Sequence, residues 1–381
     1  MARLESINYD PHHAIVEERK VYWVPEFGVQ AICGLPQIFW ECGTPWFEAN
    51  HWALDKIKSM DIKLNTVQNL MGHLHEYSIW LEEEKMDWRH FPTRKSDRVL
   101  VRYRGALIKA RDCGDIRPST TTARMRAVIQ FYRHCHIHSF VSRNTPKWKD
   151  KLVVVKYFDH AGFERVINRL STDMAIPNRA RPGIMLEDGL LPISAENQSQ
   201  LLRFVSEKID SSAISTLKNC SEELRLLLMA GFFTGGRIGT LTAIRVDSIE
   251  NATPAPEDSG LWILPVGPGT GIPTKFDVSG NLYIPDQLMK LLNKYAYSPR
   301  RLNRLEKASE EHRHLLFLNR FGAPYKPSAV TRGMVDLRRC ATHAGLKFMK
   351  DFYFHQTRAT FGTWLPGVKP RGHHHLSRWI H

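Results

Sequence analysis

The sequence lacks long apolar runs and closely spaced cysteines. None of its 381 residues belongs to an apolar stretch long enough to span a membrane, about eighteen residues or more. Its first residues also lack the apolar segment of a signal peptide. The six cysteines are scattered without a C-x-x-C pair, which argues against a disulfide framework and a structural zinc site. These absences predict a cytoplasmic protein without a membrane partner or a metal.

Acidic residues are also in short supply relative to basic ones. The chain has 53 Lys and Arg against 39 Asp and Glu, for a formal net charge of +14. Such an excess in a non-secreted protein indicates a polyanionic partner, namely DNA, RNA or an anionic membrane surface. A basic but otherwise ordinary surface is the alternative. The charge favours a nucleic acid.

The length exceeds one ordinary hydrophobic core and predicts two or three domains. Residues 1–58 mix aromatics with Pro and Gly, which predicts an N-terminal arm of short strands. Residues 59–140 have apolar side chains at helical spacing, so we expect a compact, basic, all-helical domain. Residues 141–190 are less regular and are predicted to be a linker, with a strand at 152–155 and an extended basic run at 176–183. A larger domain is expected over 191–381.

Cations are crowded in the helical domain and recur in the linker. A solvated basic surface is the alternative to DNA contact, and for the linker a plain connector is about equally plausible. The candidate DNA-binding residues are Arg94, Lys95, Arg98, Arg102, Arg104, Arg124, Arg126, Arg179 and Arg181.

The larger domain begins with a helix over 224–233 that is apolar nearly all round and should be buried. The Thr234-Gly235-Gly236 sequence should stop this helix, and a new one should start at Arg237. Two strands are predicted at 261–266 and 282–284, followed by a helix capped by Asp286. Further helices are expected from Ser328 and over 352–365.

Two cations of this domain occupy distinctive positions. Arg237 follows a glycine turn at a helix start, where a guanidinium can grip two phosphate oxygens, although a plain surface arginine would look the same. Lys275 is the one Lys or Arg between Glu250 and Lys290, on a strand connection. A lysine there can donate a proton to a leaving oxygen. A solvated loop lysine is the alternative.

A third feature is the pair His355 and Arg358. Their i,i+3 spacing would place both side chains on one helix face, within reach of one phosphate. A capping histidine beside an unrelated arginine is the alternative, because H-x-x-R is frequent by chance.

Taken together, the order buried helix, Gly turn, Arg237, Lys275 and His355-x-x-Arg358 resembles the catalytic domain of the tyrosine recombinases, or phage integrases. Residues 226–249 look like that family's first-arginine motif, and 316–325 look like its connecting strand and turn. The helical region 60–140 is similar to the family's core-binding domain. The resemblance therefore covers about 60–365. It implies a mainly α fold with a small β component, in which a helical core-binding (SAM-like) domain and a mixed α+β catalytic domain form a C-shaped clamp.

The resemblance also implies a chemistry and partners. In the family a tyrosine attacks a DNA phosphodiester to form a 3′-phosphotyrosyl bond, and the released 5′-hydroxyl later attacks a partner strand, with no cofactor needed. By position Arg237 and Arg358 would neutralise the transition state, Lys275 would be the general acid, and His355 would assist proton transfer or bind the phosphate. The expected partners are double-stranded DNA, to which a tetramer binds, and accessory DNA-bending proteins. The protein would then be nucleoid-associated and would integrate a mobile element.

The sequence departs from the family pattern after Arg358, because no tyrosine follows that residue. Gly372-His373 imitates the family's Gly-His pair but lies too close to Arg358, with prolines where an apolar helix should be. A truncated or frame-shifted C-terminus that leaves the catalytic domain incomplete is the explanation that best fits residues 366–381. A nucleophile from another protomer would still require a tyrosine there, and Tyr353 should lie on a different helix face from His355. The run His373 to His375 is expected to be solvated.

Two functions therefore remain open, an active site-specific recombinase and a catalytically inactive DNA-binding remnant or regulator. A basic helical nucleic-acid protein unrelated to recombinases would make the ordered Arg, Lys and His-x-x-Arg set a coincidence.

Overall fold

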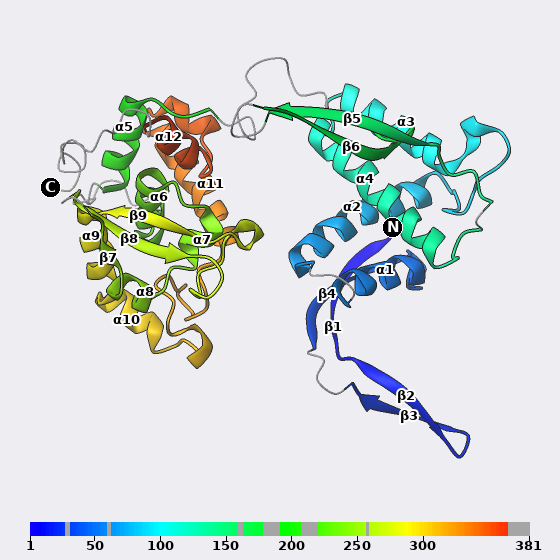
Figure 1. The fold of residues 1–381 in the computed structure, drawn as a ribbon, viewed down its shortest axis with the longest axis horizontal. Helices are drawn as coiled ribbons and strands as arrows, with labels where there is room; N and C mark the ends of the chain where they lie inside the picture. The colour runs from blue at the N-terminus through cyan, green and yellow to red at the C-terminus, as the bar shows by residue number, and fades with distance from the viewer. Residues whose placement is uncertain are drawn as a thin grey trace. The chain divides into compact units, whose positions relative to one another are not determined.

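The computed structural model describes residues 1–26, 31–58, 62–142, 144–158, 163–177, 191–206, 220–256 and 259–364. The chain divides into two compact units, residues 1–182 and 183–381. Both consist mostly of helices with small antiparallel sheets (Figure 1). No helix within the described ranges is long and apolar enough to cross a membrane.

The first unit has a helical core bordered by two-stranded sheets. Strand β1 pairs with β4, β2 with β3, and β5 with β6, all antiparallel. Helix α2 packs against both α1 and α4. The elements are β1 (Arg3–Tyr9), β2 (His12–Glu17), β3 (Lys20–Pro25), β4 (Ile32–Phe39), α1 (Phe47–Lys58), α2 (Leu64–Glu83), the 3-10 helix η1 (Lys95–Asp97), α3 (Val99–Asp112), α4 (Pro118–Ile137), β5 (Asp150–Phe158) and β6 (Glu164–Thr172).

Aromatic side chains fill this first core. Trp46, Trp52 and Phe131 are fully buried, and the rings of Trp46 and Phe131 meet edge to face at 5.0 Å between centroids. The hydroxyls of Tyr77 in α2 and Tyr132 in α4 lie 2.8 Å apart, so each buried phenol has a hydrogen-bond partner. This pairing holds the two longest helices of the unit in register.

Two sequence expectations for this unit change in the structure. The predicted N-terminal arm of strands, 1–58, ends in a helix, α1, whose Ala49, Trp52 and Ala53 enter the core. The predicted linker, 141–190, contains the β5–β6 hairpin, which belongs to the first unit. Leu152 and Leu170 of that hairpin are exposed, so backbone pairing rather than burial maintains it. Residues 178–190, with Arg179 and Arg181, lie outside the described residues.

The second unit packs its helices around a buried helix, α6, and a three-stranded sheet in the order β7-β8-β9. Its elements are α5 (Ala195–Ser206), α6 (Glu222–Thr234), α7 (Ile238–Thr242), α8 (Val246–Glu250), β7 (Thr253–Pro254), β8 (Leu261–Val266), the 3-10 helix η3 (Lys275–Asp277), β9 (Gly280–Pro285), α9 (Asp286–Ala296), α10 (Pro299–Leu305), the 3-10 helix η4 (Glu310–His312), α11 (Pro327–His343), the 3-10 helix η5 (Lys347–Asp351) and α12 (Gln356–Trp364).

Helix α6 matches the prediction closely. It is apolar nearly all round and mostly buried, and its N-cap Ser221 accepts a hydrogen bond from the Leu224 N–H at 3.2 Å. The cap of α9 is predicted one residue too late, since Pro285 holds the N-cap position and Asp286 is the first helical residue.

A buried ion-pair cluster anchors the start of α6. The Glu223 carboxylate is completely buried and lies 2.7 Å from guanidinium nitrogens of both Arg300 and Arg304. It also accepts a hydrogen bond from the Tyr295 hydroxyl at 3.0 Å. Burial opposes the charge of Glu223, but the hydrogen bond from Arg300 and the charges of both arginines outweigh it and lower its pKa.

Candidate active site

The turn that follows α6 positions the first predicted arginine. Gly235 ends the helix in the left-handed region, with φ of 62°, as the sequence predicts. The Thr234 hydroxyl donates to the Ala230 carbonyl at 2.6 Å and accepts from the Gly236 N–H at 3.1 Å, which closes the turn. Arg237 then takes the N-cap position of α7 with its side chain partly exposed. The guanidinium therefore emerges from a tightly bonded turn.

The second predicted arginine reaches the same turn from the other end of the unit. In α12, the Arg358 guanidinium donates a hydrogen bond of 2.6 Å to the Gly235 carbonyl, 123 residues away in sequence. That carbonyl belongs to the residue two positions before Arg237. The structure thus places the Arg358 guanidinium at the turn that leads to Arg237.

Glycines on α6 allow this approach of α12. A Cβ built on Gly231 would lie 2.5 Å from the Thr357 hydroxyl oxygen, and one on Gly235 would lie 2.3 Å from the Phe361 ring. Both distances are too short for any side chain, so the close packing of α6 and α12 requires glycine at these positions. Two of the glycines that precede Arg237 in sequence thereby determine where Arg358 lies.

The position of His355 differs from the sequence prediction. The last helix was expected over 352–365, but α12 begins at Gln356, and His355 lies in the tight turn before it. The Gln356 side chain accepts a hydrogen bond from the Tyr353 N–H at 2.7 Å, which tightens this entry into the helix. The His355 carbonyl accepts from the Arg358 N–H at 3.2 Å, so the two residues remain one turn apart.

Lys275 lies in the connection between β8 and β9, within the short helix η3. Its side chain is exposed, with Nζ 5.1 Å from the centroid of the Phe276 ring. The Thr240 hydroxyl of α7 donates to the Pro273 carbonyl at 3.0 Å and so ties the Lys275 loop to the helix that Arg237 begins. This contact links the third cation to the same region.

Three cations, together called the cationic site, are thus tied to the α6–α7 turn or to α7. One guanidinium is oriented by a backbone carbonyl, another stands at a helix start, and an exposed ammonium lies on a loop bonded to that helix. Guanidinium groups bind phosphate oxygens in pairs, and an ammonium can also deliver a proton. The orienting groups, Gly235 and Thr240, were not predicted as site residues. Their signal in the sequence is a glycine after a buried helix and a threonine three residues after Arg237.

The region after Arg358, where the family resemblance places the nucleophile, lies mostly outside the described residues, and Tyr353 precedes it. Tyr353 is 46% exposed, and the Arg338 guanidinium lies 4.7 Å from its ring centroid. His373 and the rest of residues 365–381 lie outside the described residues.

The candidate DNA-binding residues of the first unit fall into two groups. Five of them have intramolecular partners: Arg94 with Asp97, Lys95 with Asp173, Arg102 with Glu84, Arg124 with Glu76, and Arg98 with the Pro92, Thr93 and Pro146 carbonyls. Arg126 on α4 is exposed, and Arg104 on α3 is partly buried. The hydrogen bonds of Arg98 indicate that it serves the fold of its loop.

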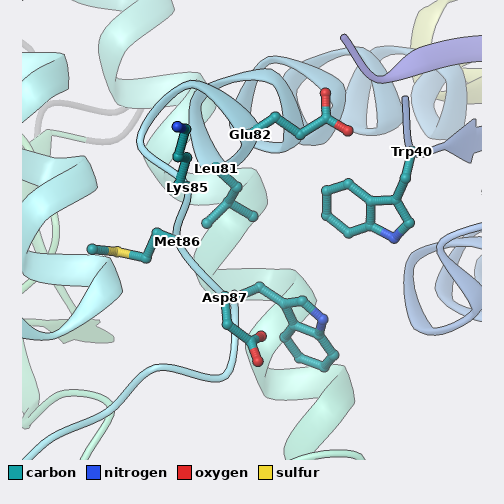
Figure 2. A pocket seen from close by; sticks show the side chains of 7 residues that line it. Trp40, Leu81, Glu82, Lys85, Met86 and Asp87 are labelled. Atoms are coloured by element: carbon teal, nitrogen blue, oxygen red, sulfur yellow. The ribbon is translucent and has the colours of Figure 1, made fainter. Parts of the chain in front are cut away.

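A pocket of about 360 Å³ opens in the first unit at the end of α2. Trp40 stands across it from Lys85 and Met86 (Figure 2). Its carboxylate Glu82 accepts hydrogen bonds from the backbone N–H groups of Ala2 and Glu41. Glu82 therefore holds the start of β1 in place, and the pocket contains none of the predicted catalytic residues.

Solved structures resemble this chain over most of its length. A fragment of the Tn1549 transposon integrase, in complex with circular intermediate DNA, matches 87% of this chain and 94% of its own, with a TM-score of 0.50 and 12% identity. The chain has the tyrosine recombinase fold. A lambda integrase fragment, a dimer bound to a COC′ core site, gives a TM-score of 0.46 at 13% identity over 88% of this chain and 95% of that one. A lambda integrase tetramer bound to a Holliday junction gives a TM-score of 0.44 and 14% identity, and the match covers 84% of this chain and 70% of that one.

No protein-family model matches the sequence, and no curated protein shows significant similarity to it. The tyrosine recombinase fold is therefore established by its three-dimensional arrangement. Because the identity is only 12%, the similarity shows the fold and not the residues of the site. The choice of those residues depends on the contacts described above.

Proposed function

We propose that this chain binds double-stranded DNA and acts in site-specific DNA recombination or integration, for a mobile genetic element. The observation that carries the proposal is the hydrogen bond from Arg358 to the Gly235 carbonyl, which places the second arginine at the turn leading to Arg237. The Tn1549 integrase fragment of the same fold was solved with DNA, which agrees with this proposal.

The proposed reaction is transfer of a DNA strand through a phosphotyrosyl intermediate. A tyrosine hydroxyl, which residues 359–381 do not contain, gives up its proton to His355 or to water as its oxygen attacks the scissile phosphorus, and the bond from phosphorus to the 5′-oxygen breaks. Lys275 donates the proton that the leaving 5′-oxygen takes up, while Arg237 and Arg358 stabilise the added charge on the phosphoryl oxygens. His355 binds the phosphate or assists the proton transfer. The reverse attack by a 5′-hydroxyl of the partner strand restores the phosphodiester without a cofactor.

The cations of the first unit would supply most of the affinity through backbone phosphates, as the second arm of a clamp around the duplex. By the family resemblance of the sequence, the working form on DNA would be a tetramer.

DNA binding without cleavage is the second candidate function. One observation supports it: residues 359–381, which follow Arg358, contain no tyrosine. Under this hypothesis the same cationic site grips a phosphodiester that the chain itself does not cut.

One experiment separates the two functions. Duplexes selected by the full chain from a random library are nicked near the bound site, so that cleavage releases a short strand and traps the covalent complex. A protein–DNA adduct on a denaturing gel that is lost in Arg358→Ala supports strand transfer. Binding without an adduct, together with an adduct from a chain extended by a tyrosine-bearing helix, supports the second function. Affinity that is independent of salt concentration would contradict both.

A further inference from the structure

Three histidines converge in the first unit, far from the cationic site in sequence. His51 lies on α1, His134 lies in the last turn of α4, and His138 follows directly after α4. Each offers a ring nitrogen, and these nitrogens all lie within 4.8 Å of one another. His134 and His138 are four residues apart, so the helix itself places them on one face.

The hydrogen bonds of this cluster orient the central ring. Nε2 of His134 lies 3.0 Å from Nδ1 of His51. The other nitrogen of His134, Nδ1, lies 3.5 Å from the Asp55 carboxylate. A carboxylate on that side favours the tautomer with the proton on Nδ1, which leaves the Nε2 lone pair directed into the cluster. His51 and Asp55 are themselves one turn apart on α1.

From this geometry we propose that His51, His134 and His138 form a zinc site, with Asp55 as the carboxylate that orients His134. Zinc binds imidazole nitrogens at about 2.0–2.1 Å in a tetrahedron, which places its ligands about 3.4 Å from one another. The nitrogens of His51 and His134 lie 3.0 Å apart and all three lie within 4.8 Å of one another, so rotation of the exposed His51 and His138 side chains can complete the tetrahedral spacing. Binding of zinc at Nδ1 of His51 moves the proton between His51 and His134 to Nε2 of His51, so that both imidazoles remain neutral.

The surroundings suit a metal bound at the surface. His134 is 6% exposed, whereas His51 and His138 are exposed, so the buried ligand anchors a site that is open to solvent on one side. The Phe140 ring meets His51 edge to face at 5.3 Å and lies against His138 at 5.8 Å, which restricts both imidazoles. A three-histidine site leaves the fourth position for water or a further ligand.

The site would act as a clip between helices. His51 belongs to α1, which follows the β1–β4 sheet, and the other two ligands belong to the end of α4. A metal bound by all three would crosslink the N-terminal part of the unit to its helical core. This role is independent of the proposed strand transfer, whose chemistry needs no metal.

Zinc titration of the full chain tests the proposal. All proteins carry Ala at 373–375, so that the terminal histidine run contributes no binding. Against a chromophoric chelator, we expect one zinc ion per chain and a rise in the thermal midpoint, because zinc binds the folded state more tightly. His51→Ala and His138→Ala, both at exposed positions, should each weaken zinc binding by about 100-fold or more. This is a larger effect than the removal of a residue that only supports a ligand. His136→Ala is the matched control.

The control is informative because His136 lies on α4 between the two ligands but contacts Lys147 instead of the cluster. Asp55→Asn should weaken binding by about 10–100-fold, the usual effect of removing a supporting carboxylate. Cobalt in place of zinc should give the visible absorption bands of a tetrahedral site. Absence of zinc binding by the parent chain, or equal affinity in His51→Ala, His138→Ala and the control, overturns the proposal.

Discussion

Gly235→Ala is expected to disrupt the candidate active site more than any other loss or gain of a single methyl group. The residue has φ of 62°, and its carbonyl receives the Arg358 guanidinium. A Cβ there would lie 2.3 Å from Cδ1 of Phe361 and 2.9 Å from Cε1. The substitution therefore combines backbone strain with a steric collision at the contact between α6 and α12.

The two effects can be sized separately. A non-glycine residue in the left-handed region costs about 1–2 kcal/mol. Forcing a methyl group into a packed core costs about 1–3 kcal/mol more. The expected loss is therefore about 2–5 kcal/mol, a large share of the roughly 5–15 kcal/mol that stabilises a typical domain. Because Phe361 and Arg358 lie one turn apart on α12, a shift of α12 that relieves the collision should also weaken the Arg358 hydrogen bond.

Gly239→Ala provides the matched control. Gly239 lies four residues further on, in α7, and a Cβ built on it meets nothing within 4 Å. Alanine at such a helical position should be neutral or stabilise by about 0.5–1 kcal/mol. For both variants, amide hydrogen exchange in α6 and α12 reports the stability of the second unit separately from that of the first. Unchanged protection in Gly235→Ala, or equal loss in both variants, would refute the reasoning.

Three further predictions follow from contacts within each unit. Glu223→Gln should destabilise the second unit by about 3 kcal/mol because it removes the buried carboxylate that is the charge partner of Arg300 and of the largely buried Arg304. The pKa of Glu223 is lowered in the folded state, so its contribution to stability is fully present above the ordinary glutamate pKa. This contribution is lost as the pH falls through the lowered folded-state pKa, and the unfolding free energies of wild type and variant should therefore converge in acid titrations. Thr240→Val removes the hydrogen bond to the Pro273 carbonyl and should destabilise the second unit by about 1 kcal/mol, with faster amide hydrogen exchange in the Lys275 loop. Thr240→Ser keeps the hydroxyl and should show neither effect. Equal exchange rates in the two variants would contradict the proposed connection between α7 and the Lys275 loop. Arg126→Ala should reduce the slope of log affinity for DNA against log salt concentration by about one unit. Arg102→Ala should reduce this slope less, because the Arg102 charge is paired with Glu84. An unchanged slope for Arg126→Ala would show that Arg126 does not contact DNA phosphates.

Elements with a strong apolar period could be predicted from sequence. The expected helices around Leu74, Val128 and Leu228 all form, because each presents a stripe or a full surface of apolar side chains to a core. The glycine turn before Arg237 was also predictable, since Gly235 adopts the positive φ that its position after a buried helix requires.

Other elements depend on contacts that local sequence does not show. Helix α1 presents small residues such as Ala49 and Ala53 to the core, so its apolar stripe is weak and the aromatics before it favour strands. The last helix starts late because the Gln356 side chain bonds the Tyr353 N–H and shortens the helical segment. His355 consequently lies in a turn.

The candidate site illustrates the same limit. Arg237 and Arg358 were predicted together through the order of a family pattern, but their contact through Gly235 spans 123 residues and no local period encodes it. Cysteine spacing and the terminal histidine run do not indicate a metal site, whereas the histidine cluster joins His51 to His134 across 83 residues. Such clusters arise from packing between helices.

Helix α6 connects the stability of the second unit to the geometry of the cationic site. Its first turn is held by Glu223, and its last residue leads into Gly235, about 18 Å away at the helical rise. Because α6 is buried on all sides, it cannot rotate or slide without opening contacts along its whole length. A shift at Glu223 should therefore be transmitted to the carbonyl that orients Arg358. DNA affinity at neutral pH should consequently fall further in Glu223→Gln than in a control variant of equal stability, and equal affinities would show that the turn is positioned by α12 instead.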